Sequence, residues 1–267
     1  MSPMSERISK MVSSSETVSV YEVDCHAPKS RIEVEEFATT TQVIVPKRGV
    51  FGIALRGKRI LVEPTTAFLL RAGVPYVADH PASCGDRCTV AIFDDALLED
   101  TLGDSAPDYG PISAATQLAA RLLAAGQRTG SLVTDERAVF FLESLAEDLA
   151  MHEEVRLGPF QLYRVDEVRA LLATDPAHAW RLEDIARRVH VSSYHLARQF
   201  RAATGITISR YLARLRIGLV LDRLQNGEPS LARIAVESGF AHHSHLSERF
   251  RAMVGVTPSA VRRILSR

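Results

Sequence analysis

The sequence IAVESGFAHHSHLSERFRAMVGVTP, residues 234–258, is typical of two helices joined by a tight turn. Gly239 permits the left-handed backbone conformation that commonly ends a helix. Leu246 and Phe250, four positions apart, place an apolar stripe on one face of the second helix. The stretch therefore predicts a helix-turn-helix unit over about residues 231–254.

The same pattern occurs about fifty residues earlier, in IARRVHVSSYHLARQFRAATGIT, residues 185–207. An isoleucine-alanine pair, a phenylalanine-arginine pair and a closing glycine align between the two stretches. Ser192 or Ser193 can cap the second helix of this copy by accepting a backbone N–H. The repeat predicts a first helix-turn-helix unit over about residues 182–203.

The segment between the two copies, SRYLARLRIGLVLDRLQNG, is predicted to form a long helix over about residues 209–226. Its apolar residues share one broad face, and Asn226-Gly227 is a typical helix end. About 17 residues at ~1.5 Å rise give a connector of roughly 25 Å. This length suits two recognition helices placed in successive major grooves, which lie about 34 Å apart.

Charge is divided unevenly along the chain, although the whole chain is neutral. Residues 181–267 hold 15 arginines, no lysine and six acidic residues, a net charge of +9. The preceding residues hold 17 basic and 26 acidic residues, a net charge of −9. A basic third attached to an acidic remainder indicates nucleic-acid binding at one end and a different role at the other.

The two repeats together resemble the DNA-binding domain of the AraC/XylS family of transcriptional regulators, over roughly Leu171 to Ile264. The second copy carries the more specific pattern, A-x-x-x-G-F-x-x-x-S-x-x-x-x-x-F-x-x-x-x-G-x-T-P. The resemblance implies seven helices, binding to double-stranded DNA in the major groove, and a contact with RNA polymerase if the protein is an activator. Glu248 departs from the resemblance, because the family usually has a basic or polar residue there.

Given that resemblance, the faces of the two recognition helices opposite their apolar stripes are expected to contact bases. These residues are Ser193, Tyr194, Ala197 and Arg198 in the first helix and His243, Ser244, Ser247 and Glu248 in the second. Arg198 is the best candidate for a bidentate contact with guanine. Glu248 either accepts from a cytosine amino group or pairs with a neighbouring arginine. Four arginines are expected to contact phosphates instead: Arg201, Arg210, Arg251 and Arg262.

Three histidines, His242, His243 and His245, lie within four positions, and this density raises the question of a metal site. Adjacent residues on a helix point about 100° apart, and the stretch lacks an H-E-x-x-H spacing. We therefore interpret them as groove and turn residues. No metal site, cofactor or catalytic residue is expected there.

The first part of the chain, from about residue 18 to residue 95, alternates short apolar stretches with turn residues. This pattern is typical of a β-sandwich or barrel, with a hairpin turn at residues 56–58. Helical periodicity begins at residue 113 and continues to about 155. The predicted fold class is α+β with two domains. The predicted ranges are a flexible N-terminus at 1–15, a cupin-like barrel domain with a helical segment at 16–155, and an all-α DNA-binding domain of two helix-turn-helix units at 160–267.

Residues 71–81, RAGVPYVADHP, and 85–88, GDRC, resemble strands and turns of the small cupin-like sensor barrel found in many AraC-type regulators. The resemblance implies a small-molecule effector bound within this barrel. Polar residues are the candidates for its binding: Arg48, Arg56, Tyr76, His80 and Arg87.

The three cysteines, Cys25, Cys84 and Cys88, raise alternative functions. His80, Cys84 and Cys88 are four positions apart, which leaves a zinc or thiol sensor as an alternative, although Pro81 would interrupt any helix aligning them. A cupin-type metalloenzyme and a DNA-repair methyl-transfer protein are further alternatives. The first lacks a histidine/glutamate cluster in the sequence and the second lacks a recognisable motif around a cysteine. The favoured prediction is a regulator that is not an enzyme.

The N-terminus is serine-rich without an apolar secretion segment, and no run of about 18 apolar residues occurs. A cytoplasmic protein without a membrane span is therefore expected. Helices within residues 113–155 carry apolar residues that either pack on the barrel or form a homodimer interface.

Overall fold

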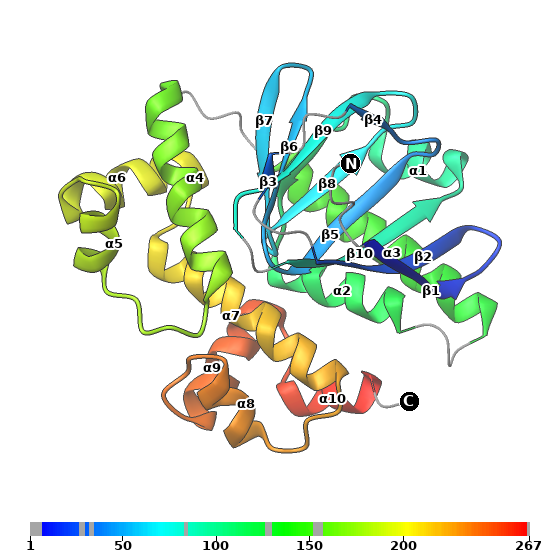
Figure 1. Ribbon diagram of the computed structural model, residues 1–267. Coiled ribbons are helices and arrows are strands. Elements are labelled where there is room, and N and C mark those ends of the chain that lie inside the picture. Colours follow the sequence, from blue (N-terminus) through cyan, green and yellow to red (C-terminus); the bar gives the residue numbers. More distant parts are fainter. Residues whose placement is uncertain are drawn as a thin grey trace.

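The computed structural model describes residues 7–26, 30–31, 35–82, 85–125, 130–151 and 157–265. It is an α+β protein of two domains that pack against one another (Figure 1). We call residues 7–151 the N-terminal domain and residues 157–265 the helical domain. None of the described helices combines the length and the apolar character that a membrane span requires.

Two antiparallel sheets form the framework of the N-terminal domain. The six-stranded sheet has the order β1-β2-β10-β5-β8-β11, and the other sheet has the order β3-β9-β6-β7 with β4 beside β9. The strands are β1 (Arg7–Ser14), β2 (Val18–Cys25), β3 (Ser30–Arg31), β4 (Glu36–Phe37), β5 (Gln42–Arg48), β6 (Phe51–Leu55), β7 (Lys58–Val62), β8 (Thr66–Leu70), β9 (Pro75–His80), β10 (Asp86–Phe93) and β11 (Tyr109–Pro111).

The predicted hairpin lies between β6 and β7. Arg56 and Gly57 form a two-residue turn in which both residues have positive φ, 49° and 77°. This is the turn geometry that matches the twist of paired strands. The two sheets face each other across one apolar core, to which Phe68 and Tyr76 contribute from opposite sheets. Side chains fill the space between the sheets.

Three helices, α1 (Asp95–Leu102), α2 (Ala114–Ala124) and α3 (Ser131–Ala150), belong to the N-terminal domain. They cover the outer face of the six-stranded sheet, where Val20 and Val45 meet Phe141 and Leu145. The central strands of this sheet are therefore buried on both faces. The sequence pattern did not predict α1 or the short strand β11.

One local prediction at the N-terminal end was wrong. Residues 7–14 form the edge strand β1 rather than part of a flexible segment, because β2 supplies its hydrogen bonds. Its side chains are mostly exposed, so it lacks the apolar alternation that marks a strand. The N-cap of α3 is Gly130, and no side chain caps this helix. Asp135 in its first turns accepts a hydrogen bond of 2.5 Å from Thr17.

The helical domain has seven described helices, as the sequence resemblance implied. These are α4 (Pro159–Thr174), α5 (Leu182–Arg188), α6 (Ser193–Thr204), α7 (Ile208–Gln225), α8 (Leu231–Glu237), α9 (His243–Val254) and α10 (Pro258–Leu265). Ser192 caps α6 by accepting from the His195 backbone N–H at 3.2 Å. Gly205 and Gly255 end α6 and α9 in the left-handed conformation.

Each helix-turn-helix unit has one residue of positive φ in its turn, but the residue differs between the two units. Gly239 has φ of +80° between α8 and α9, as expected. His190 has φ of +56° between α5 and α6, a conformation that is uncommon outside glycine but in which histidine, like asparagine and aspartate, is enriched. Gly239 also has little space around it, because a Cβ at this position would lie 2.7 Å from the carbonyl oxygen of Ala177.

Candidate nucleic-acid interface

The first recognition helix, α6, presents one polar face to solvent. Leu196 and Phe200 are buried, whereas Tyr194 and Arg198 on the opposite face are exposed. Tyr194 is 77% exposed, so its ring is accessible to a ligand. Ser193 and Ala197 are half-buried along the same face. The helix thus keeps all four predicted base-contacting residues on its accessible side.

The second recognition helix, α9, repeats this arrangement. Leu246 and Phe250 are buried, and His243, Ser244 and Glu248 are exposed. Ser247 is half-buried and lines a shallow hollow of about 610 Å³ together with Glu248, Arg251, Ala252 and Thr257. Within the described residues, no ion pair joins Glu248 to Arg249 or Arg251. Its carboxylate is therefore available to a ligand at this surface.

Three of the four predicted phosphate contacts, Arg201, Arg210 and Arg251, are exposed. Arg262 differs, because its Nη1 donates to the backbone carbonyl of Pro229 at 2.8 Å. Its Nε and Nη2 are buried and have no partner among the described residues. Arg262 thus links α10 to the loop before α8 and has little reach toward a phosphate.

The three clustered histidines have separate positions. His242 is the N-cap of α9, and its Nδ1 accepts from the His245 backbone N–H at 3.2 Å. The His245 ring lies edge-on against Phe240, with 5.6 Å between ring centroids. Of the three, His243 is the one that projects from the exposed face of α9. His242 thus serves the turn, and the contact of His243 with the groove stays a prediction.

Helix α7 connects the two helix-turn-helix units, which lie on opposite sides of it in Figure 1. One face of α7 packs on the N-terminal domain, where Leu221 shares an apolar cluster with Ala114 and Leu118 of α2. Helices α2 and α7 approach each other closely: a Cβ at Gly218 would lie 3.4 Å from Oε1 of Gln117. The helix that spaces the recognition helices is therefore held by the N-terminal domain.

A buried ion pair reinforces this contact. Arg121 of α2 is 1% exposed, and its guanidinium donates to Asp222 of α7 at 2.8 and 3.0 Å. The same guanidinium donates to the backbone carbonyl of Gly218 at 3.2 Å. Nearby, the buried Lys47 forms an ion pair with Glu22 and donates to Gln225 at 3.2 Å. Burial lowers the pKa of Lys47.

A second charged contact joins α4 to the loop after β7. Arg169 donates to Glu63 at 3.1 Å and to the backbone carbonyl of Leu61 at 3.2 Å. Burial works against the charge of Arg169, but the neighbouring Tyr211, Glu63 and Asp166 hold its pKa above the usual value. Burial also raises the pKa of Tyr211 well above its usual value. Sequence patterns gave no signal for these contacts, since each joins residues far apart in the chain.

The five predicted effector-binding residues have four different sets of partners. Arg48 and Arg87 flank Asp24, with the Arg87 Nε at 2.7 Å. Tyr76 is buried and donates to Glu36 at 2.7 Å. Arg56 pairs with Asp108, and His80 lies beside Cys25 and Asp86. The structure does not gather all five around one cavity.

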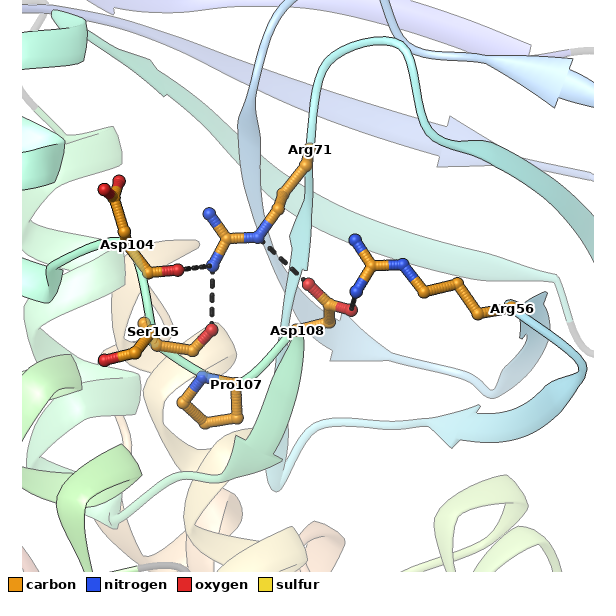
Figure 2. A pocket seen from close by; sticks show the side chains of 7 residues that line it. Arg56, Arg71, Asp104, Ser105, Pro107 and Asp108 are labelled. Carbon is orange, nitrogen blue, oxygen red and sulfur yellow. Dashed lines mark hydrogen bonds and ion pairs between the residues drawn. The ribbon is translucent and has the colours of Figure 1, made fainter.

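Arg56 lines a polar pocket of about 520 Å³ together with Arg71, Asp104, Ser105, Ala106, Pro107 and Asp108. The guanidinium groups of Arg56 and Arg71 both point at the carboxylate of Asp108, at 3.3 and 3.1 Å (Figure 2). Arg71 also donates to the backbone carbonyl of Ala106 at 2.7 Å. Two cations around one carboxylate make this a place where an external anion can compete.

His80 belongs to a buried cluster with Cys25 and Asp86. Its Nε2 lies 3.2 Å from Asp86 Oδ2 and 3.4 Å from Cys25 Sγ. Asp86 and Cys25 together raise the pKa of His80 to about 9. Cys84, which the sequence analysis grouped with His80, lies outside the described residues.

The protein has two exposed recognition helices, and one spacer helix, α7, connects them. The β-sheet domain packs against this spacer helix. This arrangement is that of a two-domain helix-turn-helix protein. Residues 12–174 match the family described as an AraC-binding-like domain, and residues 185–264 match the family described as a helix-turn-helix domain. The chain belongs to the AraC family of transcriptional regulators. This is a family of regulators rather than enzymes.

Similar proteins agree with this assignment over about a third of the chain. The chain is 37% identical over 92 residues to a putative AraC-like transcription regulator of Streptomyces antibioticus, covering 34% of the chain and 30% of that protein. It is 36% identical over 99 residues to the transcriptional activator RhaS of Escherichia fergusonii, covering 37% of the chain and 36% of that protein. The chain thus matches about a third of each relative's length.

Solved structures that match this chain include ToxT from Vibrio cholerae, with a TM-score of 0.39 and 15% identity, covering 94% of this chain and 98% of that chain. The DNA-binding domain of AdpA, in complex with a target DNA, has a TM-score of 0.36 and 26% identity, covering 38% of this chain and 90% of that chain.

Proposed function

We propose that this protein is a sequence-specific transcription regulator whose DNA binding is controlled by the docking of α7 on the N-terminal domain. The observation that carries the proposal is the attachment of the spacer helix to that domain through Arg121 and Asp222, while the polar faces of α6 and α9 stay exposed. A shift of α7 relative to the N-terminal domain changes whether α6 and α9 can enter two major grooves of the same DNA at once.

In this function, the two recognition helices occupy successive major grooves of double-stranded DNA. Arg198 reads a guanine, and His243 and Glu248 read bases in the second half of the site. Exposed arginines at the helix ends position the protein on phosphates without specifying sequence. Regulators of this kind meet their promoters in the cytoplasm, where an activator also contacts RNA polymerase.

The effector in this function is a small anion, and it binds in the pocket that Arg56 and Arg71 line. Both guanidinium groups already bind a carboxylate, that of Asp108, and this is the chemistry that recognises a carboxylate or phosphate ligand. Ligand binding here would release Asp108 and the loop that carries it. Tyr76, Arg48 and Arg87 remain further candidates for contacts with an effector.

A homodimer is the proposed oligomeric state, formed through α3. One face of α3 packs on the six-stranded sheet of the same chain, and this contact buries most of the apolar residues of α3. Leu132, Val139 and Phe140 remain exposed on it. Light scattering of the purified chain against a Phe140→Glu variant tests this, with a loss of dimer expected in the variant and an unchanged mass contradicting the proposal.

The test of DNA binding is selection of bound duplexes from a random pool, followed by affinity measurements on the selected site. Arg198→Ala is expected to lose discrimination at one base pair by about 1–3 kcal/mol. Arg201→Ala is the matched control in the same helix, with a roughly uniform loss on all duplexes and a shallower salt dependence. Equal binding of the wild-type chain to selected and scrambled duplexes would contradict the proposed function.

A further inference from the structure

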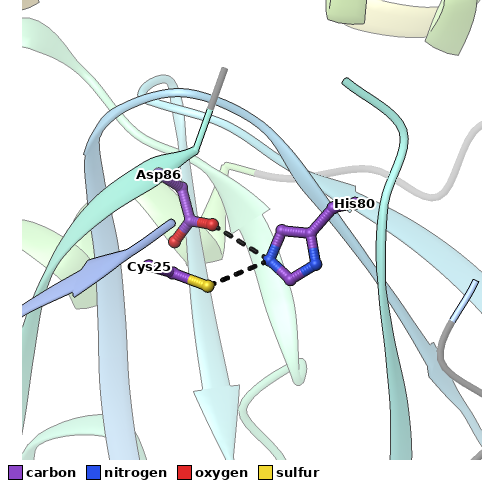
Figure 3. Close-up of side chains that lie close together, drawn as sticks. All are labelled: Cys25, His80 and Asp86. Atoms are coloured by element: carbon purple, nitrogen blue, oxygen red, sulfur yellow. Dashed lines mark hydrogen bonds and ion pairs between the residues drawn. The ribbon is translucent and has the colours of Figure 1, made fainter. Parts of the chain in front are cut away.

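Cys25, His80 and Asp86 meet at one end of the N-terminal domain, at the ends of three strands (Figure 3). Cys25 ends β2 and lies opposite Asp86, the first residue of β10, in the strand register. His80 ends β9 in the other sheet. The three residues are only 8%, 6% and 7% exposed. A thiol, an imidazole and a carboxylate thus converge in a buried space between the sheets.

The distances among the three groups fit a common metal ion. The His80 Nε2 lies 3.4 Å from Cys25 Sγ and 3.2 Å from Asp86 Oδ2, and all three ligand atoms lie within 4.8 Å of one another. Tetrahedral zinc with bonds of about 2.3 Å to sulfur and about 2.0–2.1 Å to nitrogen and oxygen places its ligand atoms roughly 3.3–3.6 Å apart. The two distances that involve His80 are close to that geometry, and the third, between Cys25 Sγ and an Asp86 oxygen, is no longer than 4.8 Å.

The polar atoms of the cluster are not fully satisfied by the protein. Asp86 Oδ2 is buried beside the His80 Nε2, at 3.2 Å, while the His80 Nδ1 is buried without a hydrogen-bond partner among the described residues. Asp86 Oδ1 receives only the thiol of Cys88, at 3.6 Å, within the described part of the chain. A buried carboxylate needs a compensating group, and a metal ion bound here would take over that role from the His80 Nε2.

Two glycines hold the cluster tightly. A Cβ at Gly49 would lie 2.1 Å from the carbonyl oxygen of Gly85 and 2.7 Å from the Cα of Asp86. A Cβ at Gly85 would lie 2.7 Å from the carbonyl oxygen of Cys25. The backbone segments that carry two of the three groups are therefore in direct contact, and this packing positions the side chains before any ligand binds.

We propose that Cys25, His80 and Asp86 bind one divalent transition-metal ion, with zinc the best match. Thiolate and imidazole ligands favour zinc over calcium or magnesium, which prefer oxygen atoms alone. Three protein ligands leave the fourth tetrahedral position to water or another ligand. Binding displaces the protons of the Cys25 thiol and of the His80 Nε2 into solvent.

The ion would join the two sheets next to the domain boundary. Ala82, two residues after His80, packs against the apolar cluster that contains Val50 and the core of the first helix-turn-helix unit. A metal at this site therefore lies beside a contact between the N-terminal domain and the helical domain. The metal site itself does not depend on the proposed DNA binding.

The decisive experiment is titration of the purified, chelator-treated full chain with Zn²⁺ in competition with a chromophoric chelator. We expect one equivalent to bind, and a loss of affinity of at least about 100-fold in Cys25→Ser, His80→Asn and Asp86→Asn. His26→Asn is the matched control, since it removes an exposed imidazole next to Cys25 and should bind as the wild type does. Binding retained in Cys25→Ser or His80→Asn would overturn the proposal.

Cobalt titration of the wild-type chain tests the site without any variant, in case the substitutions prevent folding. A tetrahedral Co²⁺ site with one thiolate gives intense visible bands and a sulfur-to-cobalt charge-transfer band in the near ultraviolet. These bands should saturate at one equivalent and disappear on addition of Zn²⁺. Absence of the charge-transfer band at one equivalent of Co²⁺ means that Cys25 is not a ligand, and the proposal is then wrong.

Discussion

Arg121 and Asp222 join the two domains across 101 positions of sequence, with the guanidinium 2.8 Å from the carboxylate. The arginine lies in a helix of the N-terminal domain and the aspartate in the spacer helix of the helical domain. Because Arg121 is fully buried and Asp222 is not, the pair is asymmetric. The arginine depends on its partner for compensation of its charge, whereas the aspartate can turn to water.

Asp222→Ala is expected to destabilise the docked arrangement strongly. The substitution leaves the Arg121 charge buried with only the carbonyls of Gln117 and Gly218 among its described partners. Removal of one partner of a buried pair costs about 3–5 kcal/mol, and we expect about 3 kcal/mol here because Asp222 reaches solvent. Urea unfolding, followed by intrinsic fluorescence and by far-ultraviolet circular dichroism, measures the change.

Asp184→Ala is the control for this prediction. Asp184 pairs with Arg187 at 3.2 Å, but both side chains are exposed and lie in one helix. Exposed pairs contribute less than about 1 kcal/mol, so the unfolding midpoint should barely move. Equal effects of the two substitutions would mean that the buried pair does not hold the domains together.

The helical domain was largely predictable from sequence because its signals are local. The cap at Ser192, the left-handed end at Gly205 and the buried pair Leu196 and Phe200 all depend on residues within one helical turn or one loop. The same holds for the hairpin turn at residues 56–57, whose strands continue directly on either side.

The contacts between domains could not be predicted in the same way. Arg169 is an ordinary helix residue in sequence, and its role depends on Glu63, 106 positions earlier. Arg262 was expected to contact phosphate because it is basic and close to α9, but it instead donates to the Pro229 carbonyl. The proposed metal-ligand cluster was missed for a related reason: Cys25 stands 55 positions before His80, and the two residues meet because their sheets pack against each other.

Gly239→Ala is expected to destabilise the second helix-turn-helix unit more than Gly205→Ala destabilises the first. The two glycines have φ of +80° and +72°, so alanine costs about 1–2 kcal/mol of backbone strain at either position. At Gly239 the added Cβ also meets the carbonyl oxygen of Ala177 at 2.7 Å, whereas the space around Gly205 is open. Thermal unfolding of the two variants measures the difference, and equal melting temperatures would contradict the steric argument.

Glu248→Gln is expected to change specificity rather than stability. The Glu248 side chain is exposed and forms no ion pair within the described part of the chain, so its loss leaves folding unchanged. If the carboxylate accepts from a cytosine amino group, the variant loses about 1–3 kcal/mol of preference at one base pair. Loss of negative charge also strengthens binding to any duplex at low salt. Parallel site selection with both proteins measures this, and identical selected sites would exclude a base contact by Glu248.

The stability of the N-terminal domain is expected to fall between about pH 10 and pH 12, with Tyr76 as one cause. Burial and the hydrogen bond to Glu36 raise the pKa of Tyr76 from 10.0 to about 12. The folded chain therefore retains a proton that the unfolded chain releases in this range, so the free energy of unfolding decreases as pH rises. Below pH 10 the hydroxyl is protonated in both states, and its contribution is constant.

Urea unfolding at several pH values should show a smaller decrease in Tyr76→Phe, whereas Tyr194→Phe, which changes an exposed side chain, should match the wild type. A slope in Tyr76→Phe as steep as that of the wild type would mean that other groups cause the loss.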